Sequence, residues 1–376
     1  MSSLISCEKF VAVTKGLHID FYDNIAHSIF TVTPSSQLQE NDQITDIAVS
    51  SDCKYFAVIT STSKQLITYE VATLKEQNSF SLPRSASKVR FTVDNMQLLI
   101  ADKSGDVLIY DVNGKEGGKK LLGHLSLLLD ILQTPDKKYI ITTDRDEKIR
   151  VTCYPNTYTI ETYCLGHKEF VNHIEILPHN ENFLSSTSGD GTIKIWDYIK
   201  GKISYTIDTY VDVNDHDLKE KFIKVMDAEG VEVTTLPIVH YSVTKINESS
   251  SLLAVTVHSF NIILLYTVHT VDNVFSHKVE RLNWKNFPAA INFQDSFLFI
   301  YDNVDCNLIK YNVVKKDENV SLELLNKTTM FENVSNGLTS NISNSFDSIR
   351  VLYKRKFDNV QEYQERKKQR LEKSLE

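Results

Sequence analysis

The chain has 376 residues, of which 41% are hydrophobic and 10% aromatic, so it carries enough apolar surface for a sizeable core. A chain of this length ordinarily divides into about two or three domains, unless it is built from repeats. Its formal net charge of −8 argues against a protein whose whole surface is coated with nucleic acid.

The N-terminal residues and the cysteines indicate the compartment. Glu8 and Lys9 interrupt the first stretch before any apolar run, so we expect no secretory signal peptide. Apolar runs such as Ile262 to Tyr266 are far too short to span a membrane. The five cysteines have neither paired nor zinc-ligand spacing, which is typical of free thiols. These features predict a soluble protein in a reducing, intracellular compartment.

A strand-rich pattern recurs seven times along the chain. The clearest copy opens with Gly166-His167 and closes its third strand with Trp196-Asp197. The copy before it opens with Gly123-His124, 43 residues earlier. Taken from the N-terminus, the residues at the position of the tryptophan are Tyr22, Tyr69, Tyr110, Thr152, Trp196, Tyr266 and Tyr311. Units of about 40–45 residues with Gly-His and Trp-Asp marks are the signature of WD repeats, each of which forms one propeller blade.

The spacing of these seven marks predicts the architecture. Successive marks are 47, 41, 42, 44, 70 and 45 residues apart, so five of the six spacings correspond to one four-stranded blade. We predict an all-β fold, a seven-bladed WD-repeat β-propeller over residues 1–353, followed by a charged, basic C-terminal helix or tail over residues 354–376. Few residues precede Phe10, so we expect a strand from within residues 345–352 to complete the first blade.

The one long spacing indicates an insert at about residues 208–236. This stretch contains the polar run Asp212 to Asp217. Long polar connections between strands generally lie on the surface, so we expect a surface loop.

Four side chains of the clearest copy occupy the positions in which WD repeats bury a hydrogen-bonded set. They are His167, Ser186, Asp190 and Trp196. We interpret them as a structural tetrad, because buried polar groups need partners, and a catalytic His–Asp dyad is the alternative. The corresponding residues of the preceding copy are His124, Thr142, Asp146 and Thr152. That blade lacks the aromatic ring, so we expect it to be less well braced.

Enzyme motifs are missing from the sequence. It contains no glycine-rich dinucleotide motif, no P-loop, no HExxH zinc motif and no GxSxG nucleophile elbow. We therefore expect no catalysis and neither a cofactor nor a metal bound to this chain.

Two charged segments are candidate binding sites. Arg145, Lys148 and Arg150 cluster at a turn that carries small residues in the next copy. This cluster is either a solvated edge or a docking patch for an acidic partner surface. Residues 354–376 hold eight Lys/Arg and five Asp/Glu, so a tail of charge +3 follows a body of −11. It is either a solvated end or a basic helix that contacts RNA phosphates through Lys354, Arg355, Lys356, Arg366, Lys367, Lys368 and Arg370.

Three motifs around these sites, LGHLS (122–126), TDRDEKIRV (143–151) and YCLGHKEFV (163–171), resemble the non-catalytic WD-repeat subunit of tRNA (guanine-N(7))-methyltransferase. The tail that begins with FDNV (357–360) is also similar to animal members of that family.

The resemblance implies a nuclear heterodimer. The partner would be a Rossmann-type enzyme that carries S-adenosylmethionine and methylates a guanine in the variable loop of tRNA. This chain would hold that enzyme in its active conformation, with Arg145, Lys148 and Arg150 on the docking edge. The alternative function is a general WD-repeat scaffold, such as a ubiquitin-ligase adaptor or a chromatin-binding propeller.

Overall fold

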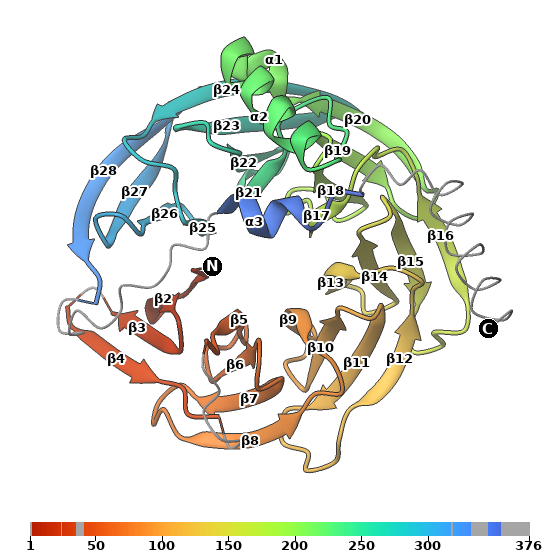
Figure 1. Cartoon of the computed structure of the whole chain (residues 1–376), viewed down its shortest axis with the longest axis vertical. Coiled ribbons are helices and arrows are strands. Elements are labelled where there is room, and N and C mark those ends of the chain that lie inside the picture. Colours follow the sequence, from red (N-terminus) through yellow and green to blue (C-terminus); the bar gives the residue numbers. More distant parts are fainter. Residues whose placement is uncertain (1, 24, 35–40, 317–318, 332–344, 355–376) are drawn as a thin grey trace, which may run out of the picture.

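The computed structural model describes residues 2–23, 25–34, 41–316, 319–331 and 345–354. Seven antiparallel sheets, each of four strands, stand in a ring around a central channel (Figure 1). In each blade the strands follow chain order from the channel to the rim. All seven residues predicted to match the tryptophan position lie on the third strand of a blade. The predicted seven-bladed propeller and its repeat register are therefore confirmed.

The strands of the seven blades have the following bounds. Blade one contains β1 (Leu4–Cys7), β2 (Phe10–Lys15), β3 (His18–Tyr22) and β4 (His27–Thr31). Blade two contains β5 (Ile44–Val49), β6 (Tyr55–Thr60), β7 (Gln65–Glu70) and β8 (Glu76–Ser81). Blade three contains β9 (Ala86–Phe91), β10 (Gln97–Asp102), β11 (Asp106–Asp111) and β12 (Lys119–Gly123). Blade four contains β13 (Leu128–Gln133), β14 (Tyr139–Asp144), β15 (Ile149–Cys153) and β16 (Ile160–Cys164). Blade five contains β17 (Val171–Ile176), β18 (Phe183–Ser188), β19 (Thr192–Asp197) and β20 (Lys202–Asp208). Blade six contains β21 (Ile238–Asn247), β22 (Ser250–Val257), β23 (Ile262–Val271) and β24 (Val274–Asn283). Blade seven contains β25 (Ala290–Gln294), β26 (Phe297–Asp302), β27 (Asn307–Lys316) and β28 (Asn319–Thr329).

The core lies between the blades, because each blade buries both of its faces against its neighbours. The second strands are the most deeply covered, and β18 and β22 are buried along their whole length. β-Branched and other apolar side chains dominate β22, as expected for a strand that packs on both faces.

Polar side chains of the innermost strands join three pairs of neighbouring blades. The carboxylate of Asp46 accepts a hydrogen bond from the Val89 amide at 3.0 Å, and that of Asp130 accepts one from the Ile174 amide at 3.0 Å. A third pair, blades six and seven, is joined where the Ser242 hydroxyl accepts from the Phe293 amide at 2.9 Å. Since these bonds satisfy buried groups, they fix the blades relative to one another.

The ring closes differently from the sequence-based expectation. β1 pairs with β2, so residues before Phe10 themselves supply the inner strand of blade one. Leu4 and Val13 pack against Phe299 and Tyr301 of blade seven. Residues expected to form the closing strand lie in a short helix instead, α3 (Ser345–Arg350). The prediction was wrong because β1, a strand of four residues joined to β2 by a tight turn, is long enough to complete blade one.

The insert is helical, so the expectation of a loop was also wrong. It contains α1 (Thr209–Val213) and α2 (His216–Ala228), and both begin at an aspartate. Asp208 accepts a hydrogen bond from the Tyr210 amide, and Asp215 accepts one from the Leu218 amide. The polar run that suggested a loop thus includes an N-cap of a helix. Neither these helices nor α3 is long and apolar enough to cross a membrane, and the described residues contain no other helix.

Buried histidines should make the fold sensitive to acid. Burial lowers the pKa of His179 and of His258 to about 4, and that of His240 to about 3. Between these values and the ordinary pKa of 6.5, the unfolded chain binds more protons than the folded chain. The free energy of unfolding therefore rises with pH in this window and falls as the pH drops from about 6.5 towards 4.

We expect His179→Gln to weaken this pH dependence. The imidazole lies 2.6 Å from the Ser251 hydroxyl and 2.8 Å from that of Thr270, and a glutamine amide can replace one of these bonds without titrating. Urea unfolding at pH 7 and pH 5 would measure the effect. Equal losses of stability in the variant and the unchanged chain would show that His179 does not contribute.

Candidate protein-docking face

The predicted tetrad of blade five forms a closed hydrogen-bonded set. The Nε1 of Trp196 donates to the Ser186 hydroxyl at 2.8 Å, and the Nε2 of His167 lies 2.8 Å from the same oxygen. The Nδ1 of His167 lies 3.0 Å from the Asp190 carboxylate. Burial holds the pKa of His167 below its ordinary value. Burial opposes ionisation of Asp190, but hydrogen bonds from His167 and Thr192 lower its pKa.

This arrangement resembles a Ser–His–Asp triad in its connectivity, yet it offers nothing to a substrate. Ser186 and Trp196 are completely buried, and His167 is only 7% exposed. Attack by the serine would require a substrate to displace the indole ring. The geometry therefore supports the structural interpretation over the catalytic dyad.

Blade four builds its equivalent set with a different aspartate. The Nδ1 of His124 lies 3.0 Å from the carboxylate of Asp144, and its Nε2 lies 2.8 Å from the Thr142 hydroxyl. Asp146, which the sequence alignment of the repeats suggested for this role, instead lies beside Lys354. The loop of blade four has Asp144 where blade five has Ser188, and the shift by two residues explains the error.

Arg150 belongs to the interior of blade four rather than to its edge. The residue is 7% exposed, and its guanidinium donates to the Gly123 carbonyl at 2.9 Å and to the Thr152 hydroxyl at 3.1 Å. Thr152 is the residue that replaces the aromatic ring. The arginine therefore supports the position where blade five has Trp196, and it does not project from the docking edge as expected.

We expect Arg150→Ala to lower the free energy of unfolding by about 1–3 kcal/mol, because it leaves a buried carbonyl and hydroxyl without their donor. Lys194→Ala is the matched control at the same register of blade five, where the ammonium makes one bond of 3.3 Å to Thr206. The control should cost less in a urea-unfolding measurement. An Arg150→Ala variant as stable as the unchanged chain, but unable to bind a partner, would return Arg150 to the docking face.

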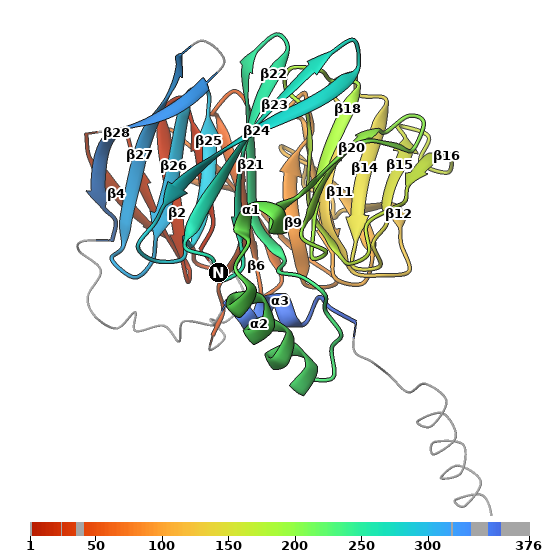
Figure 2. The same ribbon diagram turned by 90° about the horizontal axis from the view of Figure 1, so that it is seen from above.

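Arg145 and Lys148 lie in the loop between β14 and β15, and both are half-buried. The Arg145 amide donates to the Leu127 carbonyl at 2.9 Å, and the Lys148 ammonium donates to the Asp146 carbonyl at 3.2 Å. In an antiparallel meander, this loop lies at the same end of the ring as the connections from one blade to the next. Figure 2 shows α2 and α3 on one face of the ring, and the loop of Arg145 belongs to that face.

Unpaired polar atoms and exposed apolar side chains gather at this end of blade four. Among the residues that the structure describes, the buried Arg145 Nε, Ser126 hydroxyl and Thr143 hydroxyl lack a hydrogen-bond partner. Leu125 is fully exposed, and Leu165 is 61% exposed. Exposed apolar side chains on one face are a feature of surfaces that bind a partner. Sequence reasoning missed both leucines, although their places beside the two Gly-His marks were a usable signal.

The beginning of the predicted tail reaches this same loop. Lys354 lies 3.5 Å from the Asp146 carboxylate and also contacts that of Glu147. The other predicted contact residues, Arg355, Lys356, Arg366, Lys367, Lys368 and Arg370, lie outside the described residues. The structure therefore brings Arg145, Lys148 and Lys354 together, and it separates Arg150 and the tetrad from them.

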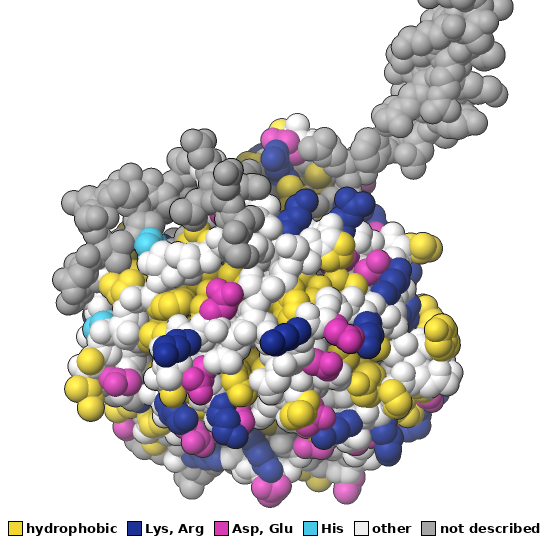
Figure 3. Space-filling view, turned by 90° about the horizontal axis from the view of Figure 1, so that it is seen from below, with side chains coloured by type: hydrophobic (Ala, Val, Ile, Leu, Met, Phe, Trp, Pro, Cys, Tyr) yellow, Lys and Arg dark blue, Asp and Glu magenta, His cyan; other side chains and the backbone are white. Residues whose placement is uncertain are grey.

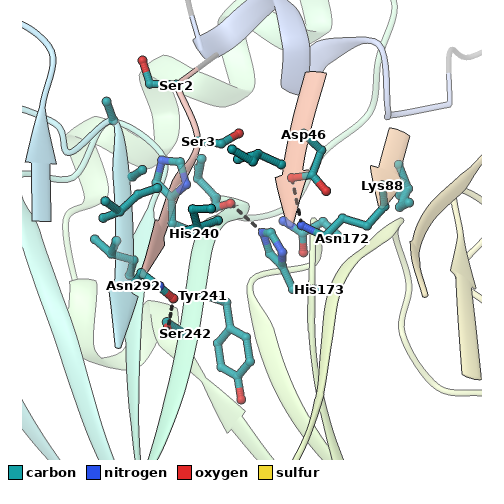
Figure 4. Close-up of a pocket in the computed structure, with 18 of the residues that line it drawn as sticks. Ser2, Ser3, Asp46, Lys88, Asn172, His173, His240, Tyr241, Ser242 and Asn292 are labelled. Carbon is teal, nitrogen blue, oxygen red and sulfur yellow. Dashed lines mark hydrogen bonds and ion pairs between the residues drawn. The ribbon is translucent and has the colours of Figure 1, made fainter. Parts of the chain in front are cut away.

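The central channel contains a cavity of about 1340 Å³. Figure 4 shows Lys88 and Asp46 on its wall with His173 and His240, and the ammonium of Lys88 lies 3.3 Å from the Asp46 carboxylate. Within the described part of the chain, no three histidine, cysteine or acidic side chains are placed to hold a metal ion. On the rim, Figure 3 shows basic and acidic side chains interspersed, without a large patch of one sign.

Comparison with known proteins shows which family this chain resembles. Residues 113–306, just over half of the chain, match the family described as the tRNA methyltransferase TRM82 WD40 domain. The chain is 32% identical over 342 residues to the tRNA (guanine-N(7)-)-methyltransferase non-catalytic subunit wuho of Drosophila grimshawi, covering 88% of this chain and 80% of that protein. It is 46% identical over 164 residues to the protein of the same name from Drosophila mojavensis, covering 42% of each.

One solved structure is similar to this chain in fold alone. A chain of the crystal structure of the mitotic checkpoint complex superimposes with a TM-score of 0.65 at 13% identity, covering 83% of this chain and 90% of that one.

Proposed function

Because this chain belongs to the family of non-catalytic WD-repeat subunits of tRNA (guanine-N(7)-)-methyltransferase, we propose that it binds and stabilises a Rossmann-type catalytic subunit. In this heterodimer the partner carries S-adenosylmethionine and forms 7-methylguanosine in the variable loop of tRNA. The propeller supplies a rigid surface and no reacting group. We also propose that the complex works in the nucleus.

The observation that carries this proposal is the composition of the blade-four face. Arg145 and Lys148 provide positive charge, and Leu125 and Leu165 provide exposed apolar area on the same face of the ring. Interfaces combine an apolar centre with a polar rim, and arginine is enriched in them. A carboxylate of the catalytic subunit beside the half-buried side chain of Arg145 would form a charge-assisted pair with its guanidinium.

Purification of the chain from cell extract is the direct test. The proposal expects one methyltransferase to accompany the chain in equal amounts. Recovery of ubiquitin-ligase or histone components in its place would favour a general scaffold. A fluorescent fusion that stays outside the nucleus would contradict the proposed location.

The basic tail is proposed to contact tRNA phosphates, starting from Lys354 on the same face. We expect a chain ended at Val360 to keep its fold and its catalytic subunit, because the seven sheets close without residues 361–376. Its affinity for tRNA should fall. The slope of the logarithm of affinity against the logarithm of salt concentration should also become shallower, by about 0.9 for each lost phosphate contact.

The measurement is tRNA binding by the full and shortened heterodimers across a salt series. Parallel lines of equal affinity would show that the tail is only a solvated end. Loss of the catalytic subunit from the shortened chain would show that the tail docks protein instead.

A further inference from the structure

The segment around α3 is held firmly on the propeller, although it follows the last blade. Ile349 is 5% exposed and Tyr353 is 4% exposed, and both belong to the apolar cluster of Phe222 and Met226 from α2. The hydroxyl of Tyr353 donates to the Gly189 carbonyl in blade five at 2.8 Å. The insert helix thus forms one wall of the site in which this segment lies.

Ion pairs complete the attachment on both sides of the apolar contact. The guanidinium of Arg350 lies 2.6 Å from the carboxylate of Glu229, just beyond the end of α2. The ammonium of Lys354 contacts the carboxylates of Asp146 and Glu147 in the blade-four loop. Burial opposes the charge of Lys354, but its hydrogen bond to Glu147 raises its pKa, so the ammonium stays charged at neutral pH.

Glu147 occupies a backbone position that suits glycine. Its φ is 63°, and the matching residue of blade five is Gly191, with a φ of 72°. A side chain in this left-handed region is strained relative to glycine, because its Cβ crowds the backbone. Blade four therefore carries a carboxylate where the backbone would prefer none, and this carboxylate contacts Lys354.

We propose that Lys354, seated between Asp146 and Glu147, is a positioning residue that sets the direction in which the basic tail leaves the propeller. This inference rests on the proposed contact of the tail with tRNA. The basic residues that follow Lys354 begin at once with Arg355 and Lys356. Anchoring the chain immediately before them lowers the entropy lost when they contact phosphates, because fewer residues remain to be ordered.

Removing the carboxylates of Asp146 and Glu147 distinguishes anchoring of the tail from a general attraction between tRNA and positive charge. Asp146→Asn with Glu147→Gln makes the face more positive by two charges, so unaided electrostatics would strengthen tRNA binding. If Lys354 anchors the tail, the same variant should instead bind tRNA more weakly. We expect the affinity of the heterodimer for tRNA to fall by about threefold to tenfold, because the released segment must then be ordered on binding.

Two further variants serve as controls. Asp136→Asn with Glu161→Gln also removes two exposed carboxylates from blade four, but away from Lys354, and it should leave the affinity unchanged or slightly higher. Lys354→Arg keeps the charge and should bind tRNA like the unchanged chain. An affinity of the Asp146→Asn, Glu147→Gln heterodimer equal to or above that of the unchanged heterodimer would overturn the proposal.

Hydrogen exchange on the chain alone gives a readout that needs no tRNA. Amides of residues 349–353 should exchange faster in the Asp146→Asn, Glu147→Gln variant than in the unchanged chain. Unchanged exchange would overturn the anchoring role even if the tail contacts tRNA. A third outcome combines two results: the Asp146→Asn, Glu147→Gln chain exchanges faster, but ending the chain at Val360 leaves the affinity of the heterodimer for tRNA unchanged. In that case the anchoring contact exists and the proposed contact of the tail with tRNA is wrong.

Discussion

Asp130→Ala should lower the free energy of unfolding by about 3–5 kcal/mol, the largest stability effect that we expect from a single substitution. The carboxylate is completely buried and accepts two hydrogen bonds from Arg90, at 3.1 and 2.9 Å. It also accepts from the amides of Ile131 and Ile174. Burial opposes its ionisation, but the charge of Arg90 lowers its pKa overall. Alanine would leave a largely buried guanidinium and an inter-blade amide without this partner.

The contact of Arg90 with Glu175 at 2.7 Å remains in that variant, so the loss should lie towards the lower end of the range. Lys200→Ala is a suitable control, because it breaks an exposed ion pair with Asp197 and should cost less than about 1 kcal/mol. Chemical denaturation of both variants would measure the difference. Equal, small losses would contradict the role assigned to the inner-strand carboxylates.

The second large effect should appear in binding. Arg145→Glu combined with Lys148→Glu should weaken the heterodimer by about 2–5 kcal/mol, or roughly thirtyfold to several thousandfold, because it places like charges against an acidic surface. The fold should survive, since both side chains are half-buried in a loop and no carboxylate pairs with either of them among the described residues.

Lys137→Glu with Lys138→Glu is the matched control. It reverses two charges in the same blade, but in the turn between β13 and β14 at the opposite end of the strands. Both of these lysines are exposed, at 47% and 71% of the side chain. Calorimetric titration with the catalytic subunit should show wild-type affinity for this control. Equal weakening by both double variants would mean that overall charge, rather than this face, governs binding.

The parts of the fold that could be predicted are those that repeat. Five of the six spacings between the third-strand positions from Tyr22 to Tyr311 correspond to one blade, so each position supports the others and the blade count follows. The tetrad could be placed because all four residues of blade five match the repeat. Blade four departs from it at two positions, and there the inference failed: Asp144 replaces Asp146, and Arg150 takes an interior role beside Thr152.

Features that depend on contacts between distant segments could not be predicted. Asp215 looks like part of a polar loop until its bond to the Leu218 amide identifies it as a helix cap. Phe222 and Met226 are the two buried residues of α2, and their partners Ile349 and Tyr353 lie more than 100 residues away. The meeting of Lys354 with Glu147 across 207 residues has no local signal at all.

The most direct measurement of the central claim is methyl transfer to tRNA by the catalytic subunit at increasing amounts of this chain, with S-adenosylmethionine labelled in its methyl group. The account predicts no transfer by the chain alone and a rate that rises until one chain is present for each catalytic subunit. The Arg145→Glu, Lys148→Glu variant should need far higher concentrations to reach the same rate. A catalytic subunit whose rate is the same with and without this chain, or transfer by the chain alone, would contradict the account.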